Sequence, residues 1–358
     1  MSRWRRYVYV VVNTFSLPSF PLRCIEASTL FVSNNQMKAT RELEEGRLPR
    51  PDISFIPRPK GGGNGRLDFL MPFGRGKNKS LIAATDEEGF TSLYDVIKRA
   101  VLRPVVLNRP TPFYSPISLA VGDELYAMDK EPSPCAEGGF DVLRFPGSGR
   151  AFPVKGDWTW HSLPPPSYVL APGYRPHGGI DAYTVVPGRA GAGPFIWVST
   201  PGIGTYAFDT RSGRGLWSKA GHWELPFRGR ADYLPEYGVW LGFSPRTNML
   251  CAANLLDASM ERGPRLLHDD WVDLCAPEDW ILNESHLVDL GGGRLCVAKF
   301  FRTEHEEMAL NGEIYTEVDD EFAVFTGLKL ERLGGELRMI KHRSLRYRFG
   351  PMAQSWVF

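Results

Sequence analysis

Histidine and carboxylate side chains gather in one stretch of the sequence that could bind a metal ion or a charged partner. The segment from Glu304 to Glu321 reads EHEEMALNGEIYTEVDDE, so acidic residues surround His305. Zinc and calcium sites of familiar type need a spacing such as HExxH or DxDxDG, which neither this segment nor His268-Asp269-Asp270 contains. We therefore expect no metal and no cofactor. We interpret residues 302–321 as an acidic loop insertion, a suitable place for a protein partner.

Sequence motifs for nucleophilic or phosphate chemistry are missing as well. GxSxG does not occur, and neither glycine run, at 61–65 or 291–294, continues into GK[ST]. A copper-radical oxidase needs two histidines and two tyrosines, one of these beside a cysteine, but the seven histidines include no close pair. The sequence therefore indicates a protein that is not an enzyme.

Charge and cysteine content exclude several partners. The formal net charge is +1 and the pI about 7.7, which favours neither nucleic acid nor an acidic membrane surface. The five cysteines are scattered without a CxxC motif, as is typical of a reducing compartment, so we expect a cytoplasmic or nuclear protein. The basic start is followed by an apolar core of only residues 7–12, which favours a β-strand over a secretory signal.

The elements that would position any site are short strands. Glycine and proline, 37 and 29 residues of 358, interrupt the chain too often for long helices. Residues 117–166 read ISLAV, DELYAMD, GGFDVLRFP and WTWHSLPPP, which are four apolar or aromatic runs separated by turn residues. This pattern predicts four consecutive antiparallel strands, as in one blade of a β-propeller.

Similar units recur along the chain. The second strand of each predicted unit begins at Leu81, Leu125, Phe195, Leu250 and Leu295. These positions are on average about 54 residues apart, close to the period of kelch repeats. We therefore predict an all-β chain folded as one kelch-like β-propeller domain over residues 1–358.

Strands at the start of the chain remain outside these five units. Residues 7–12 and 22–31 read as strands, and residues 33–65 as a long Pro/Gly-rich surface connection with an edge strand near 53–56. Because an open sheet edge promotes aggregation, we expect the N-terminal strands to pair with C-terminal ones and complete a blade. This predicts six blades, with five as the alternative.

Several segments resemble a known family. GRLDFLMP, SPISLAVGDELYAMD, LCAANL and above all LWSKAGHWELPFRGRADYLPEYGVWLGFS resemble a plant family, expanded in grasses, that carries a domain of unknown function. The resemblance covers about residues 7–349 and implies a kelch-like propeller related to those found behind F-boxes, with no established activity. The sequence departs from that arrangement because no three-helix F-box precedes the first strand. The glycine doublet of kelch second strands is missing too.

Other side chains have structural interpretations that we prefer. Asp95, Asp129 and Asp209 each end an aromatic-bearing run and are expected to accept hydrogen bonds from the following turn. Six tryptophans are expected to pack one blade against the next, namely Trp158, Trp160, Trp217, Trp223, Trp240 and Trp271. Trp223 is the exception that could be exposed. The alternating charges of residues 341–349 suit an edge strand.

The sequence thus predicts a monomer that acts as a non-catalytic protein–protein interaction module and binds an unidentified protein, but neither nucleic acid nor a membrane. The candidate partner-binding residues lie in three loops, and they are His177, His222, Trp223, Arg228, Glu304, His305, Glu306, Asp319 and Asp320. The alternative is a propeller enzyme, a sugar hydrolase or oxidase with its site in the central channel.

Overall fold

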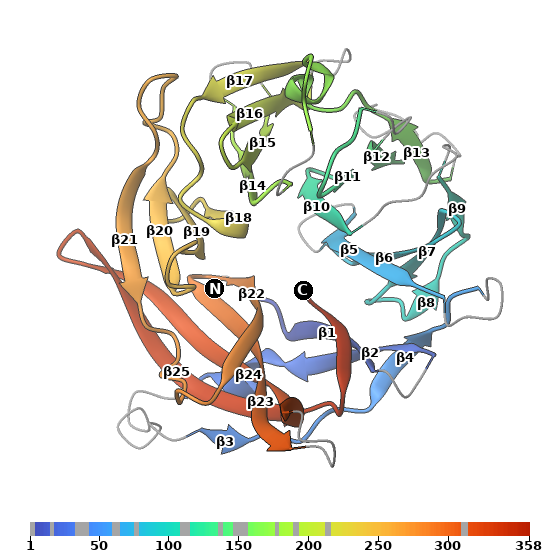
Figure 1. Cartoon of the computed structure of the whole chain (residues 1–358), viewed down its shortest axis with the longest axis vertical. Helices are drawn as coiled ribbons and strands as arrows, with labels where there is room; N and C mark the ends of the chain where they lie inside the picture. The colour runs from blue at the N-terminus through green and yellow to red at the C-terminus, as the bar shows by residue number, and fades with distance from the viewer. Residues whose placement is uncertain are drawn as a thin grey trace. The chain divides into compact units, whose positions relative to one another are not determined.

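The computed structural model describes residues 4–14, 18–32, 43–58, 65–74, 79–107, 115–134, 139–145, 157–175, 179–188, 193–211, 216–308 and 314–358. These residues are all-β except for two single-turn 3-10 helices, η1 (Ala27–Leu30) and η2 (Ser167–Leu170). None of these segments forms a helix that is long and apolar enough to cross a membrane. Contacts divide the chain into unit 1 (Met1–Ile56, Thr247–Leu250 and Asp269–Phe358) and unit 2 (Pro57–Arg246 and Cys251–His268) (Figure 1).

Unit 2 begins with two antiparallel sheets. The first contains β5 (Leu67–Phe73), β6 (Leu81–Asp86), β7 (Phe90–Asp95) and β8 (Ala100–Val101), with β9 (Val105–Val106) also on β7. The second contains β10 (Pro116–Val121), β11 (Glu124–Asp129), β12 (Phe140–Arg144) and β13 (Thr159–Ser162), paired in chain order. The prediction of four consecutive antiparallel strands within residues 117–166 is therefore confirmed.

The next eight strands form one continuous sheet from two groups of four. The first group is β14 (Ala182–Val186), β15 (Phe195–Thr200), β16 (Gly204–Asp209) and β17 (Trp217–Gly221). The second group is β18 (Arg228–Leu234), β19 (Val239–Phe243), β20 (Leu250–Asn254) and β21 (Arg265–Trp271). The first strands of the two groups, β14 and β18, pair in parallel. Leu250 begins the third strand of its group, and not the second as predicted, because 231–243 contains two strands.

Apolar clusters join consecutive sheets of unit 2 face to face, which is how blades of a β-propeller pack. One cluster brings Leu81 and Leu93 of the first sheet against Leu125 and Trp160 of the second. Others join the second sheet to β15 and β16, and the β14 group to β19 and β20. Burying such surface contributes roughly 25 cal/mol per Å², so these clusters hold the sheets together.

Tryptophan side chains occupy these junctions. The Trp160 indole Nε1 donates a hydrogen bond of 3.0 Å to Thr91 Oγ1 in the preceding sheet, and Trp240 Nε1 donates one of 3.0 Å to the Val185 carbonyl. The predicted packing role is therefore confirmed for these residues. It also holds for Trp223, because its ring packs 5.6 Å from that of Trp197 and its Nε1 donates to the Ser259 carbonyl.

Two aspartates act as the sequence predicts. Asp95 Oδ1 accepts hydrogen bonds from the backbone N–H groups of Ile97 and Lys98, at 3.0 and 3.1 Å. Asp209 Oδ1 accepts one from the N–H of Arg211, at 2.9 Å. These bonds hold the turn that follows each strand, because a short acidic side chain can reach backbone donors two residues further on.

Unit 1 contains two further sheets around one apolar cluster. In one, β26 (Met352–Val357), β1 (Tyr7–Thr14), β2 (Phe20–Glu26) and β4 (Pro51–Phe55) are neighbours in that order. β1 and β26 are antiparallel, with Val10 opposite Val357, so the predicted pairing of N-terminal and C-terminal strands is confirmed. The strand predicted near residues 53–56 is β4, within the connection 33–65.

The other sheet of unit 1 corrects two predictions. It contains β22 (Ile281–Gly291), β23 (Arg294–Met308), β24 (Ile314–Leu333), β25 (Glu336–Arg348) and β3 (Glu44–Glu45). The segment 302–321, predicted to be a loop, is a β-hairpin in its described residues, because β-branched residues alternate through Ile314–Val318 and favour an extended backbone.

The second correction concerns the edge of this sheet. β25 contains the charged stretch from Lys341 to Arg348, and β3 covers two of its residues by parallel pairing of Leu345 with Glu44 and of Arg346 with Glu45. Ion pairs hold β3 in place, since Arg343 Nε lies 2.8 Å from Glu44 Oε1 and Arg346 pairs with Glu45. The charges of Arg343 and Arg346 are thereby paired within the chain.

Candidate functional site

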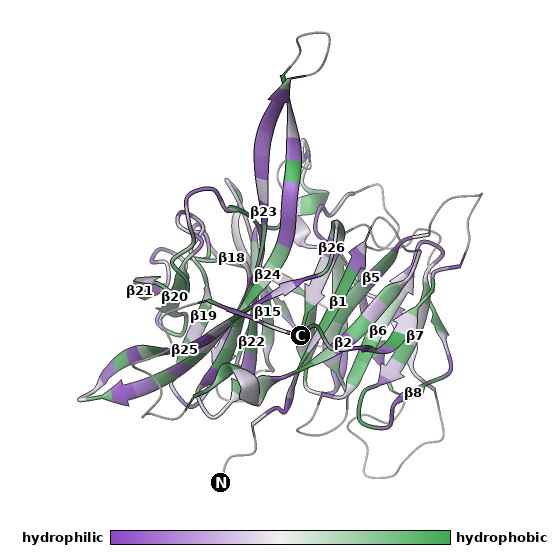
Figure 2. Cartoon of the chain, turned by 90° about the horizontal axis from the view of Figure 1, so that it is seen from below, coloured by the Kyte–Doolittle hydropathy of each residue, from purple (hydrophilic) through white to green (hydrophobic). Residues whose placement is uncertain are grey.

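The feature of this chain best suited to binding is the part of the β23–β24 hairpin that extends beyond its neighbours. β22 follows β23 only to Arg302, and β25 begins to pair with β24 at Phe322. The residues Thr303–Met308 and Ile314–Asp320 therefore pair only with each other among the described residues, and we call them the arm. Figure 2 shows this two-stranded ribbon standing out from its sheet, coloured mostly as hydrophilic.

The arm has two chemically different faces, because side chains alternate along each strand. Cross-strand pairs of His305 with Glu317 and of Glu307 with Tyr315 define one face, which we call the acidic face. The other face, which we call the branched face, carries three β24 residues, Ile314, Thr316 and Val318, opposite Met308, Glu306 and Glu304 of β23. A bulge at Asp319 ends the regular pairing near the base.

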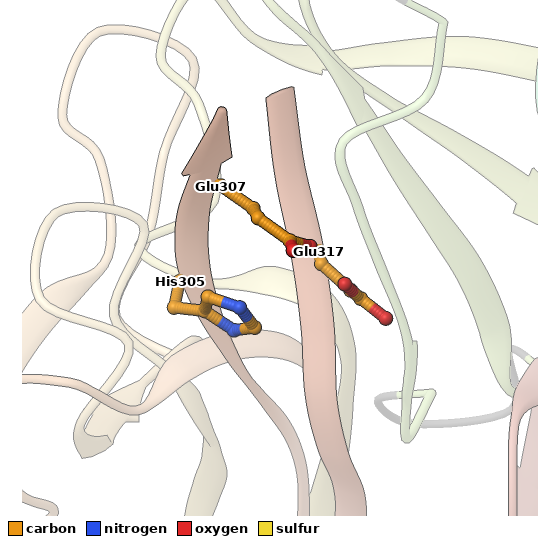
Figure 3. A group of neighbouring side chains, drawn as sticks. All are labelled: His305, Glu307 and Glu317. Atoms are coloured by element: carbon orange, nitrogen blue, oxygen red, sulfur yellow. The ribbon is translucent and has the colours of Figure 1, made fainter. Parts of the chain in front are cut away.

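Figure 3 shows three side chains of the acidic face, those of His305, Glu307 and Glu317. Hydrogen bonds to neighbouring residues organise this face. His305 Nδ1 lies 2.7 Å from Asp319 Oδ1, and the Tyr315 hydroxyl donates a 2.7 Å hydrogen bond to Glu307 Oε2. The bond from Tyr315 is the main cause that lowers the pKa of the Glu307 carboxyl. The same bond to Glu307 raises the pKa of Tyr315. Glu307 therefore stays ionised at neutral pH, so this face carries negative charge.

Three side chains of the acidic face could also hold a cation. His305, Glu307 and Glu317 each offer a ligand atom, and these atoms lie within 4.8 Å of one another. Imidazole and carboxylate groups suit zinc or manganese. All three residues are exposed, however, and the hydrogen bonds to Asp319 and Tyr315 account for their positions without an ion.

The branched face exposes apolar side chains to solvent. Met308 is 69% exposed, Ile314 63% and Val318 47%. Together with Tyr315, at 45%, they are four of the large apolar or aromatic side chains that the described surface leaves uncovered. Such side chains clustered on one projecting ribbon favour contact with another molecule.

At its base the arm is held by ion pairs that neutralise some of its carboxylates. Asp320 Oδ2 lies 2.9 Å from Arg348 Nε, and Arg348 Nη1 in turn lies 3.1 Å from Glu45 Oε2. Glu304 pairs with Arg302 on its own strand. Among the described residues of the arm, Glu306, Glu307 and Glu317 therefore keep their carboxylates outside these ion pairs, whereas those of Glu304 and Asp320 are paired at the base.

The structure places the predicted binding residues in two different units. Glu304, His305, Glu306, Asp319 and Asp320 all belong to the arm in unit 1.

Three other predicted residues, His222, Trp223 and Arg228, belong to unit 2. His222 and Arg228 are exposed there, whereas Trp223 is half-buried and packs against Trp197. His177 lies outside the described residues.

Sequence reasoning missed the arm residues that give its faces their character. Glu307, Tyr315 and Glu317 on the acidic face, and Ile314 and Val318 on the branched face, were not among the predicted residues. The alternation Ile-Tyr-Thr-Glu-Val at 314–318 was the available signal, because β-branched residues at every second position are typical of a strand. The density of charge around it favoured the loop interpretation.

A small cavity in unit 2 offers no comparable chemistry. It lies beside Ile117, Phe140 and Ile196. Two hydroxyls belong to its lining residues, but both are already bonded: Ser118 Oγ accepts a hydrogen bond of 2.9 Å from the Met71 backbone N–H, and the Tyr126 hydroxyl donates one of 2.8 Å to Glu124 Oε2. Substrate pockets combine apolar walls with several convergent polar groups, which this cavity does not. We interpret it as a packing gap.

These features define an all-β protein built from antiparallel sheets, whose distinguishing surface is an exposed two-faced arm. The chain belongs to the protein family of unknown function DUF1668, whose pattern matches residues 5–347. A search of the curated proteins found no match.

The solved structures that are similar to this chain share little of its sequence. The periplasmic gluconolactonase PpgL of Pseudomonas aeruginosa is 10% identical, with a TM-score of 0.44 over 98% of this chain and 99% of its own. A protein from Lactobacillus plantarum is 12% identical, with a TM-score of 0.43 over 98% and 99%. The Cps50 (Swd1) β-propeller domain of Myceliophteria thermophila is 12% identical, with a TM-score of 0.38 over 95% of each chain. Such values carry no argument about activity.

Proposed function

We propose that this protein is a non-catalytic protein-interaction module built on a kelch-like β-propeller of six blades, and that the arm binds its partner. The observation that carries the proposal is the arm itself, which keeps apolar and charged side chains in water on a rigid support. Arg302 and Glu321 at its base are paired with β22 and the Met352 N–H, so the arm has a fixed root. Binding elements are commonly presented in this way by a stable scaffold.

The six blades of the proposal correspond to six groups of strands. These are the two sheets of unit 1 and, in unit 2, the sheets of β5–β9, β10–β13, β14–β17 and β18–β21. The face-to-face packing of consecutive groups in unit 2 and the parallel contact of β14 with β18 support the assignment. In a propeller, the first strands of neighbouring blades line a common axis and run in the same direction.

We prefer this function to an enzyme with its site in a central channel. Among the described residues, the cluster of histidine and carboxylates with ligand spacing lies on the exposed arm and not in a concave cavity. Catalytic groups act best where water is excluded and positions are fixed. We also propose a monomer in the cytoplasm or nucleus, consistent with the thiols of Cys275 and Cys296, which are not part of a disulfide.

Removal of the arm tests the proposal. Arg302 and Glu321 lie directly opposite each other, so a two-residue Asn-Gly turn can join them in place of residues 303–320. In quantitative affinity purification from the native tissue, we expect at least one partner to be lost from the shortened protein. Leu333→Asp at the exposed tip of the β24–β25 hairpin is the control and should keep that partner. An unchanged set of partners for the shortened protein, with its fold intact by circular dichroism, would refute the proposal.

A further inference from the structure

The outer edge of β24 within the arm is open to the addition of another strand. β25 pairs with β24 only from Phe322 onward, so the outward backbone groups of Ile314–Asp319 have no ladder partner among the described residues. An isolated two-stranded ribbon is marginally stable in water, and a third strand would satisfy its free backbone groups. Addition of an extended peptide to such an edge is a common mode of recognition.

Side chains along this edge alternate in a way that selects a sequence. Ile314, Thr316 and Val318 lie on the branched face and carry no charge, whereas Tyr315 and Glu317 lie on the acidic face beside Glu307. The opposite edge, formed by β23, differs because Glu304 and Glu306 place charge on the branched face as well. The β24 edge therefore offers an incoming strand one uncharged face and one acidic face, whereas the β23 edge carries carboxylates on both faces.

We infer that the β24 edge of the arm binds an extended segment of the partner protein in which basic residues alternate with apolar ones. The inference rests on the proposed function and specifies its partner. Every second side chain of the added strand would lie over the acidic face, where Lys or Arg is attracted to Glu317 and Glu307. The intervening side chains would lie beside Ile314 and Val318, which an apolar residue would cover.

Geometry sets the length of this segment. The bulge at Asp319 ends the regular edge, so the open part spans Ile314 to Asp319. At about 3.3 Å per residue this is roughly 20 Å, enough for six residues of a partner strand. The position opposite Glu317 is central in this stretch and should carry the most selective basic residue.

A second copy of this chain fits the edge poorly. Antiparallel association of two β24 edges would bring Glu317 and Glu307 of one copy close to the same carboxylates of the other. Like charges directly opposite each other destabilise a strand pair. A basic segment of another protein meets no such repulsion.

Synthetic peptides test the inference directly. A peptide of about eight alternating Lys and Val residues is compared with a block peptide of the same composition and with an alternating Glu-Val peptide, by isothermal titration calorimetry at about 0.15 M ionic strength. We expect the alternating Lys-Val peptide to bind at least about fivefold more tightly than the block peptide. Equal affinities would show charge attraction alone and would overturn the inference, as would no binding by any peptide.

Protein variants test the faces. The double variant Glu307→Lys and Glu317→Lys should lose the Lys-Val peptide and gain the Glu-Val peptide, because the charge of one face is reversed while the branched face is kept. Glu336→Lys, an exposed carboxylate on β25 outside the arm, is the matched control and should leave both affinities unchanged. Loss of the Lys-Val peptide without gain of the Glu-Val peptide would count against recognition by this face.

Backbone pairing needs its own measurement. Two Lys-Val peptides, N-methylated at either all valine or all lysine amides, place the blocked groups on opposite edges of the added strand. One should fail to bind and the other should bind, because only one edge of the peptide faces β24. Equal binding by both would exclude strand addition. If the peptides fail but shortening the arm still removes a partner in cells, the inference falls and the proposed function stands.

Discussion

At the scale of single residues, several side chains have roles that are independent of binding. His342 on β25 is buried, its Nδ1 accepts a hydrogen bond of 3.4 Å from the Val32 N–H, and its Nε2 has no hydrogen-bond partner within the described structure. Burial is the main cause that lowers the pKa of His342, and the charges of Lys329 and Arg294 lower it further. The folded protein therefore holds this imidazole in its neutral form.

This buried histidine predicts how stability depends on pH. A histidine in the unfolded chain titrates near pH 6.5, so below that pH the unfolded state binds a proton that the folded state resists. The free energy of unfolding should therefore fall as the pH is lowered from about 6.5 toward the lower folded pKa. Urea unfolding at several pH values measures this, and His342→Gln should flatten the decline. An equally steep decline in that variant would assign it to other groups.

Asp273 and Lys299 form a buried ion pair in unit 1. The Lys299 Nζ lies 2.8 Å from Asp273 Oδ1, and both side chains are almost fully buried. Burial raises the pKa of Asp273, and the charge of Lys299 opposes that rise. Asp273→Ala should destabilise the fold by about 3–5 kcal/mol, because it leaves a buried ammonium group without this carboxylate. Chemical denaturation measures the loss.

The double variant Asp273→Ala, Lys299→Met is the control for this pair. It removes both charges, so most of the lost stability should return. If the double variant were as unstable as the sum of the two single variants, the two charges would not be coupled.

At the scale of elements, tryptophan connects the sheets of unit 2. Trp240 on β19 is fully buried, packs 4.3 Å from the Tyr233 ring and bonds to the Val185 carbonyl of β14. Trp240→Ala should lower the free energy of unfolding by about 3–5 kcal/mol, because it empties a large volume and leaves the carbonyl unpaired. Leu216→Ala, at a residue 64% exposed, should have little effect in the same urea titration. Equal effects would contradict this role of Trp240.

The arm, in contrast to Trp240, should contribute little to the stability of the fold. Its side chains from His305 to Met308 and from Ile314 to Asp319 are exposed, so it contributes little buried apolar area. Replacing residues 303–320 with Asn-Gly should therefore change the melting temperature by only a few degrees, about what 1 kcal/mol gives in a chain of this size. Differential scanning calorimetry would reveal a larger drop, which would mean that the arm packs on other parts of the chain.

Local patterning explains which elements the sequence could reveal. Strands β10 to β13 were predictable because each is a short apolar run with turn residues on both sides, and the Asp95 and Asp209 turns followed from side-chain length alone. The two-residue strand β3 has no pattern of its own, since Glu44 and Glu45 are held by arginines about 300 positions away. The arm was hidden because its carboxylates gave the composition of a loop, while their cross-strand bonds depend on register.

At the scale of the whole molecule, the family and the sheets are established, and the proposed function depends on the arm. The sequence indicated the all-β class, since turns and aromatic runs repeat along the chain. It could not indicate which residues would meet at the binding surface, because His305 and Glu317 become neighbours only through the pairing of β23 with β24.

The pairing of β1 with β26 gives a prediction at this scale. Tyr9 and Phe358 exchange two backbone hydrogen bonds of 2.9 Å, and Val357 is buried in the apolar cluster of unit 1. Deleting residues 352–358 should lower the melting temperature by more than shortening the arm does, because it exposes the edge of β1 and removes a buried valine. Equal melting temperatures for the two variants would show that β26 contributes no more to stability than the arm does.

The same pairing has a consequence for the way the protein is made in the cell. Val10 leaves the ribosome long before Val357, its opposite residue. At about 5–20 residues per second, roughly 20–70 s pass between the synthesis of these two residues. For that time β1 must keep an apolar edge without its final neighbour, so a chaperone that shields nascent chains would have to cover this strand until β26 has been made.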